Sequence, residues 1–169
     1  MDLKELNMII RDEKGNELLE IIKVDEAQAE NLYAPITHAL VVVKIGEEYL
    51  MGWNKWRQDW EIFGGCKEEG ETIRECIVRE AYEELGLENV EYTYLGLMKL
   101  KLAPSYFSSE WREEYGGLYG ITLSEDMFEV IEKYRTDKEE IEKLEFYRRI
   151  KVDEKIAVMD EKLLEFWKK

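Results

Sequence analysis

The chain has 169 residues, 45% of them hydrophobic, and its 39 acidic and 24 basic side chains give a formal net charge of −15. This length is enough for one domain with a hydrophobic core of its own. A chain this acidic is not expected to bind a nucleic-acid polymer, and it lacks an apolar run of the roughly 18 residues that a transmembrane helix needs.

The N-terminus and the cysteines favour a cytoplasmic protein with no membrane association. The opening stretch MDLKELNMII lacks the basic and apolar regions of a signal peptide. Cys66 and Cys76 are both interpreted as reduced thiols. With these two cysteines and the single His38, a zinc site is not expected.

The order of apolar and turn-forming residues predicts a strand-rich chain with one central helix. An N-terminal hairpin is expected within residues 6–24, around the turn at 12–16. The apolar run 38–45 predicts a buried strand that pairs with 47–54 across Gly46. The later predictions are strands at 92–102, 117–123 and 143–150, an exposed loop at 105–116, a mixed strand and helix segment at 125–138, and a closing amphipathic helix with Asp160 near its start.

This order predicts an α/β fold, in which a mixed β-sheet lies inside a sandwich and an N-terminal β-hairpin is added. A single domain over 1–169 is expected. It divides into a strand extension at 1–35, a core at 36–150 and a C-terminal helix at 151–169. The N-terminal strands are a candidate surface for pairing across a homodimer.

The central helix has clear start and stop signals. Thr72 and Glu75 form a capping-box pattern at its start, and Gly86 stands where a left-handed C-terminal residue is wanted. A stripe of apolar residues is expected to face the core, consisting of Ile77, Val78, Ala81 and Leu85.

Three acidic residues lie within one turn of this helix, beside the apolar stripe. Glu80, Glu83 and Glu84 are spaced so that they share a face, where like charges repel. A hard divalent cation with oxygen ligands would neutralise them, and Mg²⁺ uses a few carboxylates together with substrate phosphates. The pattern therefore predicts a metal-binding helix.

The segment from 65 to 87 resembles the Nudix box and matches it at every fixed position. Those positions are Gly65, Glu71, Arg79, Glu80, Ala81, Glu83, Glu84, Gly86 and Leu87. The preceding stretch WEIFGG is similar to the family's usual Trp-x-x-Pro-Gly-Gly, with Phe63 where proline is common. The resemblance implies a Nudix-type α/β/α sandwich with a central catalytic helix. It also implies a hydrolase of MutT-like type that cleaves a diphosphate linked to another moiety, with Mg²⁺ or Mn²⁺ as cofactor.

The resemblance also assigns roles to the residues of the box. Glu83 and Glu84 would be metal ligands, and Glu80 either a ligand or the base that activates water. The carbonyl of Gly65 would add a ligand, and Glu71 would stabilise the loop or bind a further ion. Arg79 would hold a carboxylate in its productive orientation. Because some members use a glutamate in a later loop as the base, Glu139 and Glu140 are the alternatives to Glu80.

Residues before the box are candidates for binding the substrate. Trp56 is the best candidate to stack on a nucleobase. Arg57 and Lys55 are candidates for contacts with phosphates. Trp60 is expected to be a packing residue, and His38 is expected to be structural.

The predicted function is a Mg²⁺-dependent hydrolase that acts on a small-molecule nucleotide or organic diphosphate. Its substrate would be of the ADP-ribose, sugar-nucleotide or (d)NTP class. One alternative is a catalytically silent ligand-binding module on the same fold. The other is a protein like isopentenyl-diphosphate isomerase. That reaction needs a cysteine upstream of the box and a histidine-rich metal site, which this sequence does not provide.

Overall fold

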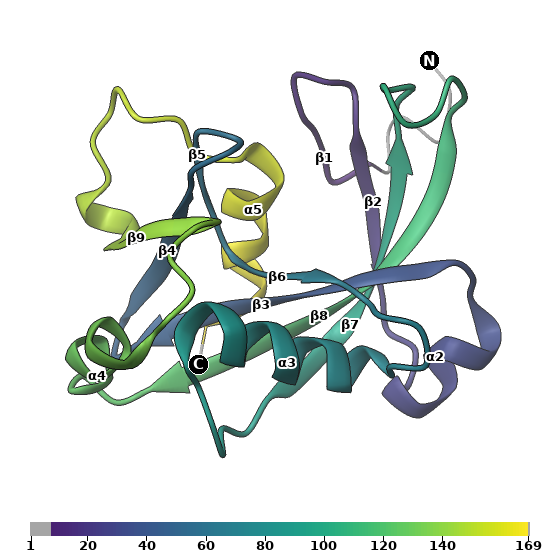
Figure 1. The fold of residues 1–169 in the computed structure, drawn as a ribbon. Coiled ribbons are helices and arrows are strands. Elements are labelled where there is room, and N and C mark those ends of the chain that lie inside the picture. The colour runs from purple at the N-terminus through teal and green to yellow at the C-terminus, as the bar shows by residue number, and fades with distance from the viewer. Residues whose placement is uncertain (1–7, 169) are drawn as a thin grey trace.

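A computed structural model describes residues 8–168, which form a mixed nine-stranded sheet with helices on both faces (Figure 1). The strands are β1 (Ile10–Arg11), β2 (Glu17–Ile22), β3 (Ile36–Ile45), β4 (Glu48–Asn54), β5 (Asp59–Glu61), β6 (Phe63–Cys66), β7 (Thr93–Leu102), β8 (Arg112–Leu123) and β9 (Ile141–Phe146). The helices are α2 (Glu26–Leu32), α3 (Ile73–Leu85), α4 (Met127–Tyr134) and α5 (Val158–Leu163). Two short 3₁₀-helices follow strand β9 and helix α5, η1 (Tyr147–Arg149) and η2 (Leu164–Phe166).

The strand order is β1-β2-β7-β8-β3-β4-β5, with β6 paired to β3 and β9 paired to β4. Strands β3 and β8 run parallel at the centre, whereas β3 pairs antiparallel with β4 and β6. The predicted N-terminal hairpin is present, because β1 pairs with β2, although residues 6 and 7 of its predicted range lie outside the described residues. The predicted hairpin 38–54 is present, because β3 pairs with β4. The α/β class and the mixed sheet are therefore confirmed.

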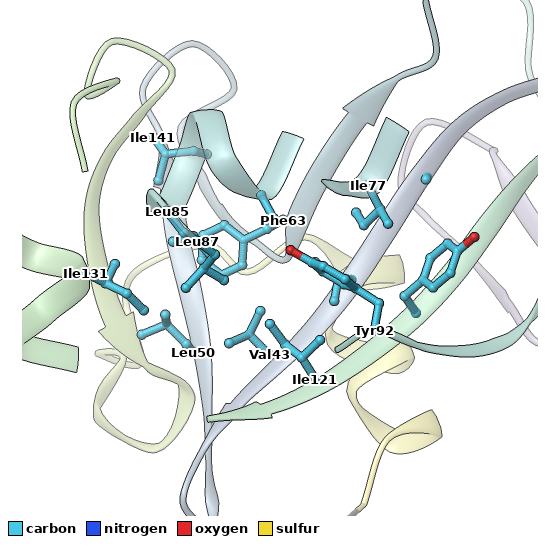
Figure 2. Close-up of a cluster of buried hydrophobic side chains, with 14 of the residues drawn as sticks. Val43, Leu50, Phe63, Ile77, Leu85, Leu87, Tyr92, Ile121, Ile131 and Ile141 are labelled. Carbon is cyan, nitrogen blue, oxygen red and sulfur yellow. The ribbon is translucent and has the colours of Figure 1, made fainter. Parts of the chain in front are cut away.

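Strand β3 has a different helix on each of its two faces. Alternate residues of a strand point to opposite sides of the sheet. Val41 and Val43 belong to the cluster that contains Ile77 and Leu85 of α3, part of which is drawn in Figure 2. Val42 belongs to a second cluster, with Leu163 and other residues of the C-terminal segment. This two-sided burial explains why β3 is an unbroken apolar run.

Helix α3 has the predicted boundaries but a different buried face. The reciprocal capping box of Thr72 and Glu75 is formed, and Gly86 has a left-handed φ of 68°. Val78 was expected in the core, but its side chain is exposed. It is one position past the core-facing Ile77, so it points away from the sheet. Ile73 and Cys76 fill the buried face in its place.

The prediction of an exposed loop at 105–116 is wrong in its second half. Strand β8 begins at Arg112, which pairs with Leu102 at the end of β7. The polar residues that suggested a loop are paired by charge across the hairpin and along β8. Lys101 lies opposite Glu113, and within β8 Arg112 Nε donates to Glu114 Oε1 at 2.9 Å. Cross-strand pairs of opposite charge stabilise an exposed strand.

Helix α2 lies in the segment that was predicted as a strand extension. It supports the start of α3, because Glu26 accepts two hydrogen bonds from the Arg74 guanidinium, at 2.8 and 2.9 Å. Glu30 accepts a hydrogen bond at 2.9 Å from the backbone amide of Ile73, the first residue of α3, whose amide has no acceptor within the helix. These partners are about 45 residues away in sequence, beyond the reach of local patterns.

The C-terminal predictions need three corrections. Strand β9 ends at Phe146 instead of residue 150, because η1 turns the chain there. Segment 125–138, predicted as part strand and part helix, contains helix α4 and no strand. The closing helix is confined to α5 and η2, shorter than 151–169, because the residues before it cross strand β5 through hydrogen bonds to both backbone groups of Trp60. Within residues 8–168, no helix combines the length and apolar character that crossing a bilayer requires.

Candidate active site

Strand β6 lies very close to the backbone of strand β3 at Gly64. Its φ is 140°, and a Cβ there would lie 2.1 Å from the carbonyl oxygen of Ala39. Only glycine fits this position. The Gly64 amide donates to Glu84 Oε1 at 2.8 Å, and Glu84 is buried. This bond fixes the position of α3 against the loop that precedes it.

Arg79 is the centre of the charge network on α3. Its Nε and Nη2 bind the two oxygens of Glu71 at 2.6 and 3.0 Å. Its Nη1 contacts Glu80 at 3.0 Å and Glu83 at 3.3 Å. Nη2 also donates to the carbonyl of Cys66 at 2.9 Å. The guanidinium therefore joins the loop to the acidic face of the helix.

The glutamates differ in how strongly they hold a proton. The bidentate bond from Arg79 lowers the pKa of Glu71 to about 2. Burial raises the pKa of Glu80, although Arg79 opposes this effect, and burial raises the pKa of Glu84 well above its ordinary value. The repulsion predicted from the sequence is thus offset by one guanidinium, which contacts both Glu80 and Glu83.

The oxygen atoms around Gly65 suit a hard cation in their chemistry. Gly65 lies directly against Glu80, since a Cβ on it would be 2.5 Å from Glu80 Oε1. The Gly65 carbonyl accepts a weak bond from Cys76 Sγ at 3.5 Å. In the described part of the chain, however, no three Asp, Glu, His or Cys side chains converge as a preformed metal cage. A cation would compete with Arg79 for Glu80 and Glu83.

A cleft of about 380 Å³ lies beside these residues. One part of its lining is Gly64, Gly65 and Glu84, from β6 and α3. Another part comes from β5 and α5, and a third from the β1–β2 turn, both of which are visible in Figure 1. The charged residues that line it are Asp12, Glu13, Lys14, Arg57, Asp59, Glu61, Glu84, Glu140, Lys155 and Asp160.

The structure separates the two candidates for a loop-borne base. Glu140 lines the cleft, and its Oε1 lies 3.7 Å from Arg57 Nη2. Glu139 is exposed and is not among the residues that line the cleft. Both residues stand in the bend just before β9, and Glu140 is held there by its carbonyl, which accepts the Lys55 amide hydrogen at 2.9 Å.

The predicted substrate-binding residues are also separated. Arg57 lines the cleft, but its Nε and Nη2 bind Glu61 at 2.7 and 3.1 Å. Trp56 and Lys55 do not line the cleft, and 70% of Trp56 is exposed with Lys55 Nζ 5.7 Å from its ring centre. Trp60 is buried, as predicted for a packing residue.

Most residues that line the cleft were not predicted as part of the site, and four of them are ionisable side chains close to the box or to β5. His38 lines it, bonded to Thr37 Oγ1 at 2.9 Å, and burial lowers its pKa. Asp59, Glu61 and Asp160 line the wall formed by β5 and α5. The one local signal was the placement of two acidic residues beside Trp60 in a strand. Nothing near Asp160 in the sequence connects it with β5.

A NUDIX domain model matches residues 34–166, which include the whole cleft-bearing part of α3. This chain belongs to the Nudix family. The predicted family is therefore confirmed. Among curated proteins, none matches the sequence significantly.

Solved structures share the fold at low sequence identity. The pyrophosphohydrolase BsRppH of Bacillus subtilis has a TM-score of 0.62 and 18% identity, over 95% of this chain and 98% of that one. A MutT NUDIX hydrolase from Burkholderia pseudomallei has a TM-score of 0.55 and 14% identity, over 76% and 94%. The NUDIX domain of Shewanella oneidensis NrtR, solved with ADP ribose, has a TM-score of 0.55 and 13% identity, over 85% and 96%.

Proposed function

We propose that this Nudix protein hydrolyses the diphosphate bond of a nucleoside diphosphate linked to another moiety. The supporting observation is that two fixed residues of the box line a cleft and the other glutamates of the box adjoin it through Arg79. Gly65 and Glu84 line the cleft, and Arg79 ties Glu80 and Glu83 to the adjoining loop. Cleavage between phosphates needs mainly positioning and neutralisation of charge, which this arrangement can provide once a cation is bound.

The proposed cofactor is Mg²⁺ or Mn²⁺, held by the Gly65 carbonyl, Glu80, Glu83 and Glu84, with Glu71 as the loop support. The donor set consists only of oxygen atoms, as both ions prefer. A bound cation would neutralise the diphosphate and increase the acidity of the attacking water. The need for it is supported by the acidity of the cleft, where Arg57 and Lys155 are already paired with Glu61 and Glu13.

Two residues are proposed for proton transfer, and Arg79 for positioning. Burial raises the pKa of Glu80, and its carboxyl lies against Gly65, which suits a group that accepts a proton from water at the box. Glu140 is the loop alternative, since it reaches the cleft and Glu139 does not. Arg79 touches carboxylates on both the loop and the helix, so it orients them without contacting the substrate.

The proposal is tested by turnover of a panel of diphosphates with and without Mg²⁺, with products identified by mass spectrometry. The panel contains ADP-ribose, sugar nucleotides, dinucleoside polyphosphates, oxidised dGTP and isopentenyl diphosphate. Glu83→Gln should abolish turnover, whereas Glu88→Gln, the same change outside the cleft, should not. Isomerised rather than cleaved isopentenyl diphosphate would indicate the isomerase alternative. Binding without any cleavage would indicate a silent ligand-binding module.

A further inference from the structure

A second group of carboxyls lies in the same cleft, away from the box in sequence. Asp59 and Glu61 come from strand β5, and Asp160 comes from helix α5. The chain is fixed on both sides of this group. Trp60 donates its amide hydrogen to the Lys155 carbonyl at 2.9 Å and accepts one from Ala157 at 2.9 Å. Backbone hydrogen bonds therefore join strand β5 to the segment before helix α5, and this contact brings the three carboxyls together although they are far apart in the sequence.

Two members of this group have their own partners. Glu61 binds Arg57 through two hydrogen bonds and also accepts one from Asn54 Nδ2 at 3.1 Å. Asp160 accepts the Ile62 amide hydrogen through Oδ2 at 2.9 Å. These bonds orient the carboxyls and balance one negative charge with the Arg57 guanidinium.

Asp59 lacks a partner at one oxygen. Only 7% of Asp59 is exposed, and its Oδ1 is a buried acceptor without a hydrogen bond in the structure. Buried polar atoms are nearly always hydrogen-bonded, because leaving them unpaired costs free energy. A ligand in the cleft that supplied an N–H or O–H group would remove this cost.

The protonation of the group favours a neutral ligand over a cation. Burial raises the pKa of Asp160 to about 7, and burial together with the Glu61 contact raises the pKa of Asp59. The charged groups that face Asp59 are Glu61, Asp160, Arg57 and Lys155. A carboxyl that keeps its proton both donates and accepts a hydrogen bond, as the edge of a heterocyclic base does.

The rest of the lining indicates what kind of neutral ligand fits. Apolar side chains line the cleft beside the carboxyls, namely Leu40, Ile62, Val158 and Met159. Such a mixture of apolar walls and a few polar groups is typical of sites for small organic ligands. It suits a flat heterocycle better than a sugar covered with hydroxyl groups.

We propose that Asp59 and Asp160 bind the nucleobase of the substrate through its N–H groups. This inference rests on the proposed function for the position of the phosphates, which would lie at the box end of the same cleft. It makes Asp59 and Asp160 specificity-determining residues and predicts a preference for bases with adjacent N–H donors.

The test measures binding of nucleosides alone, without phosphate or metal, by calorimetry or NMR titration. Guanosine has a ring N–H beside an amino group, uridine has the ring N–H alone and adenosine has the amino group alone. Methyl ribofuranoside offers only the sugar hydroxyls. Wild type should bind guanosine most tightly, and Asp59→Asn and Asp160→Asn should each weaken guanosine binding at least about tenfold. Glu88→Gln, a change outside the cleft, should leave guanosine binding unchanged. Circular dichroism confirms the fold of each variant.

The inference is overturned if no nucleoside binds, if the aspartate variants bind as wild type does, or if methyl ribofuranoside binds as well as guanosine. Failure of the hydrolase proposal gives a different result. In that case guanosine binding depends on Asp59 but no diphosphate is cleaved. If diphosphates are cleaved and Asp59→Asn leaves KM unchanged, the hydrolase proposal stands and the base-binding inference fails.

Discussion

Arg79 on helix α3 donates two hydrogen bonds to the carboxylate of Glu71 in the preceding loop, from Nε at 2.6 Å and from Nη2 at 3.0 Å. The pair spans eight residues, and Nη2 also donates to the carbonyl of Cys66, the neighbour of Gly65 on strand β6. The remaining guanidinium nitrogen, Nη1, contacts Glu80 and Glu83. One side chain thereby sets the relative positions of the loop and of the carboxylates that we propose as metal ligands.

Replacing Arg79 with lysine should impair activity more than stability. Lysine keeps the charge but cannot make the planar two-point contact. Loss of such a supporting contact typically costs about 10–100-fold in activity or metal affinity. The measurement is kcat/KM on whichever diphosphate is cleaved, alongside the apparent Mg²⁺ affinity.

Arg74→Lys is the matched control. Arg74 is on helix α3, as Arg79 is, but outside the cleft, and it makes a similar two-point contact with Glu26 of helix α2. Arg74→Lys should lower the free energy of unfolding and leave kcat/KM close to wild type. Equal losses of activity in the two variants would contradict a positioning role for Arg79.

The neighbouring glycines should respond differently to alanine. At Gly64 a Cβ would meet the Ala39 carbonyl at 2.1 Å, so Gly64→Ala must displace backbone and should reduce stability by about 2 kcal/mol or more. At Gly65 the Cβ would meet the carboxyl end of Glu80, a side chain that can move. Gly65→Ala should therefore lose much less stability than Gly64→Ala, and it should nevertheless have a lower kcat than wild type. Urea unfolding and kinetics on both variants separate the two effects, and the reverse order of stabilities would contradict this account.

Glu84 should couple Mg²⁺ to stability. A ligand that binds only the folded state stabilises it by about 2.7 kcal/mol at 100 times its Kd. Added Mg²⁺ should therefore raise the Tm of wild type in thermal unfolding. In Glu84→Gln the amide oxygen can still accept the Gly64 hydrogen bond, so the fold should persist while the Mg²⁺-dependent rise is lost. Glu88→Gln is the control and should keep the Mg²⁺-dependent rise in Tm. The same rise in Tm for Glu84→Gln would argue against Glu84 as a metal ligand.

Stability without metal should fall as the pH rises through neutrality. The folded-state pKa of Asp160 is about 7 and that of Asp59 is also raised, against 3.8 for an ordinary aspartate. Between about pH 4 and pH 7 the unfolded chain has released these protons and the folded chain still holds them, so unfolding is favoured as the pH rises. The buried Glu84 acts in the same direction. Urea unfolding in EDTA at several pH values should show a shallower decline for Asp59→Asn combined with Asp160→Asn. If the free energy of unfolding of that variant fell with pH as steeply as in wild type, the decline could not be assigned to Asp59 and Asp160.

Local sequence determined the elements whose signals lie within a few residues of each other. The capping residue Thr72 and the terminal Gly86 define helix α3 because helix ends are satisfied locally. The turn at Asp12 defines the first hairpin for the same reason, since its carboxylate accepts the amide hydrogens of Lys14 and Asn16. The spacing of Glu80, Glu83 and Glu84 placed them on one helix face, and the complete box indicated the family.

Tertiary structure decided what depends on contacts between distant segments. Helix α2 was not predicted, because its glutamates find their partners on α3. Glu140 and Glu139 are neighbours in sequence, yet Glu140 alone of the two lines the cleft, where it lies 3.7 Å from Arg57. Asp59 and Asp160 are about 100 residues apart, and the crossing of residues 155–157 over β5 is what brings them to one wall of the cleft. Burial then raises the pKa of both carboxyls, because it removes water from around them. No local stretch of sequence shows which carboxyls will be buried in this way.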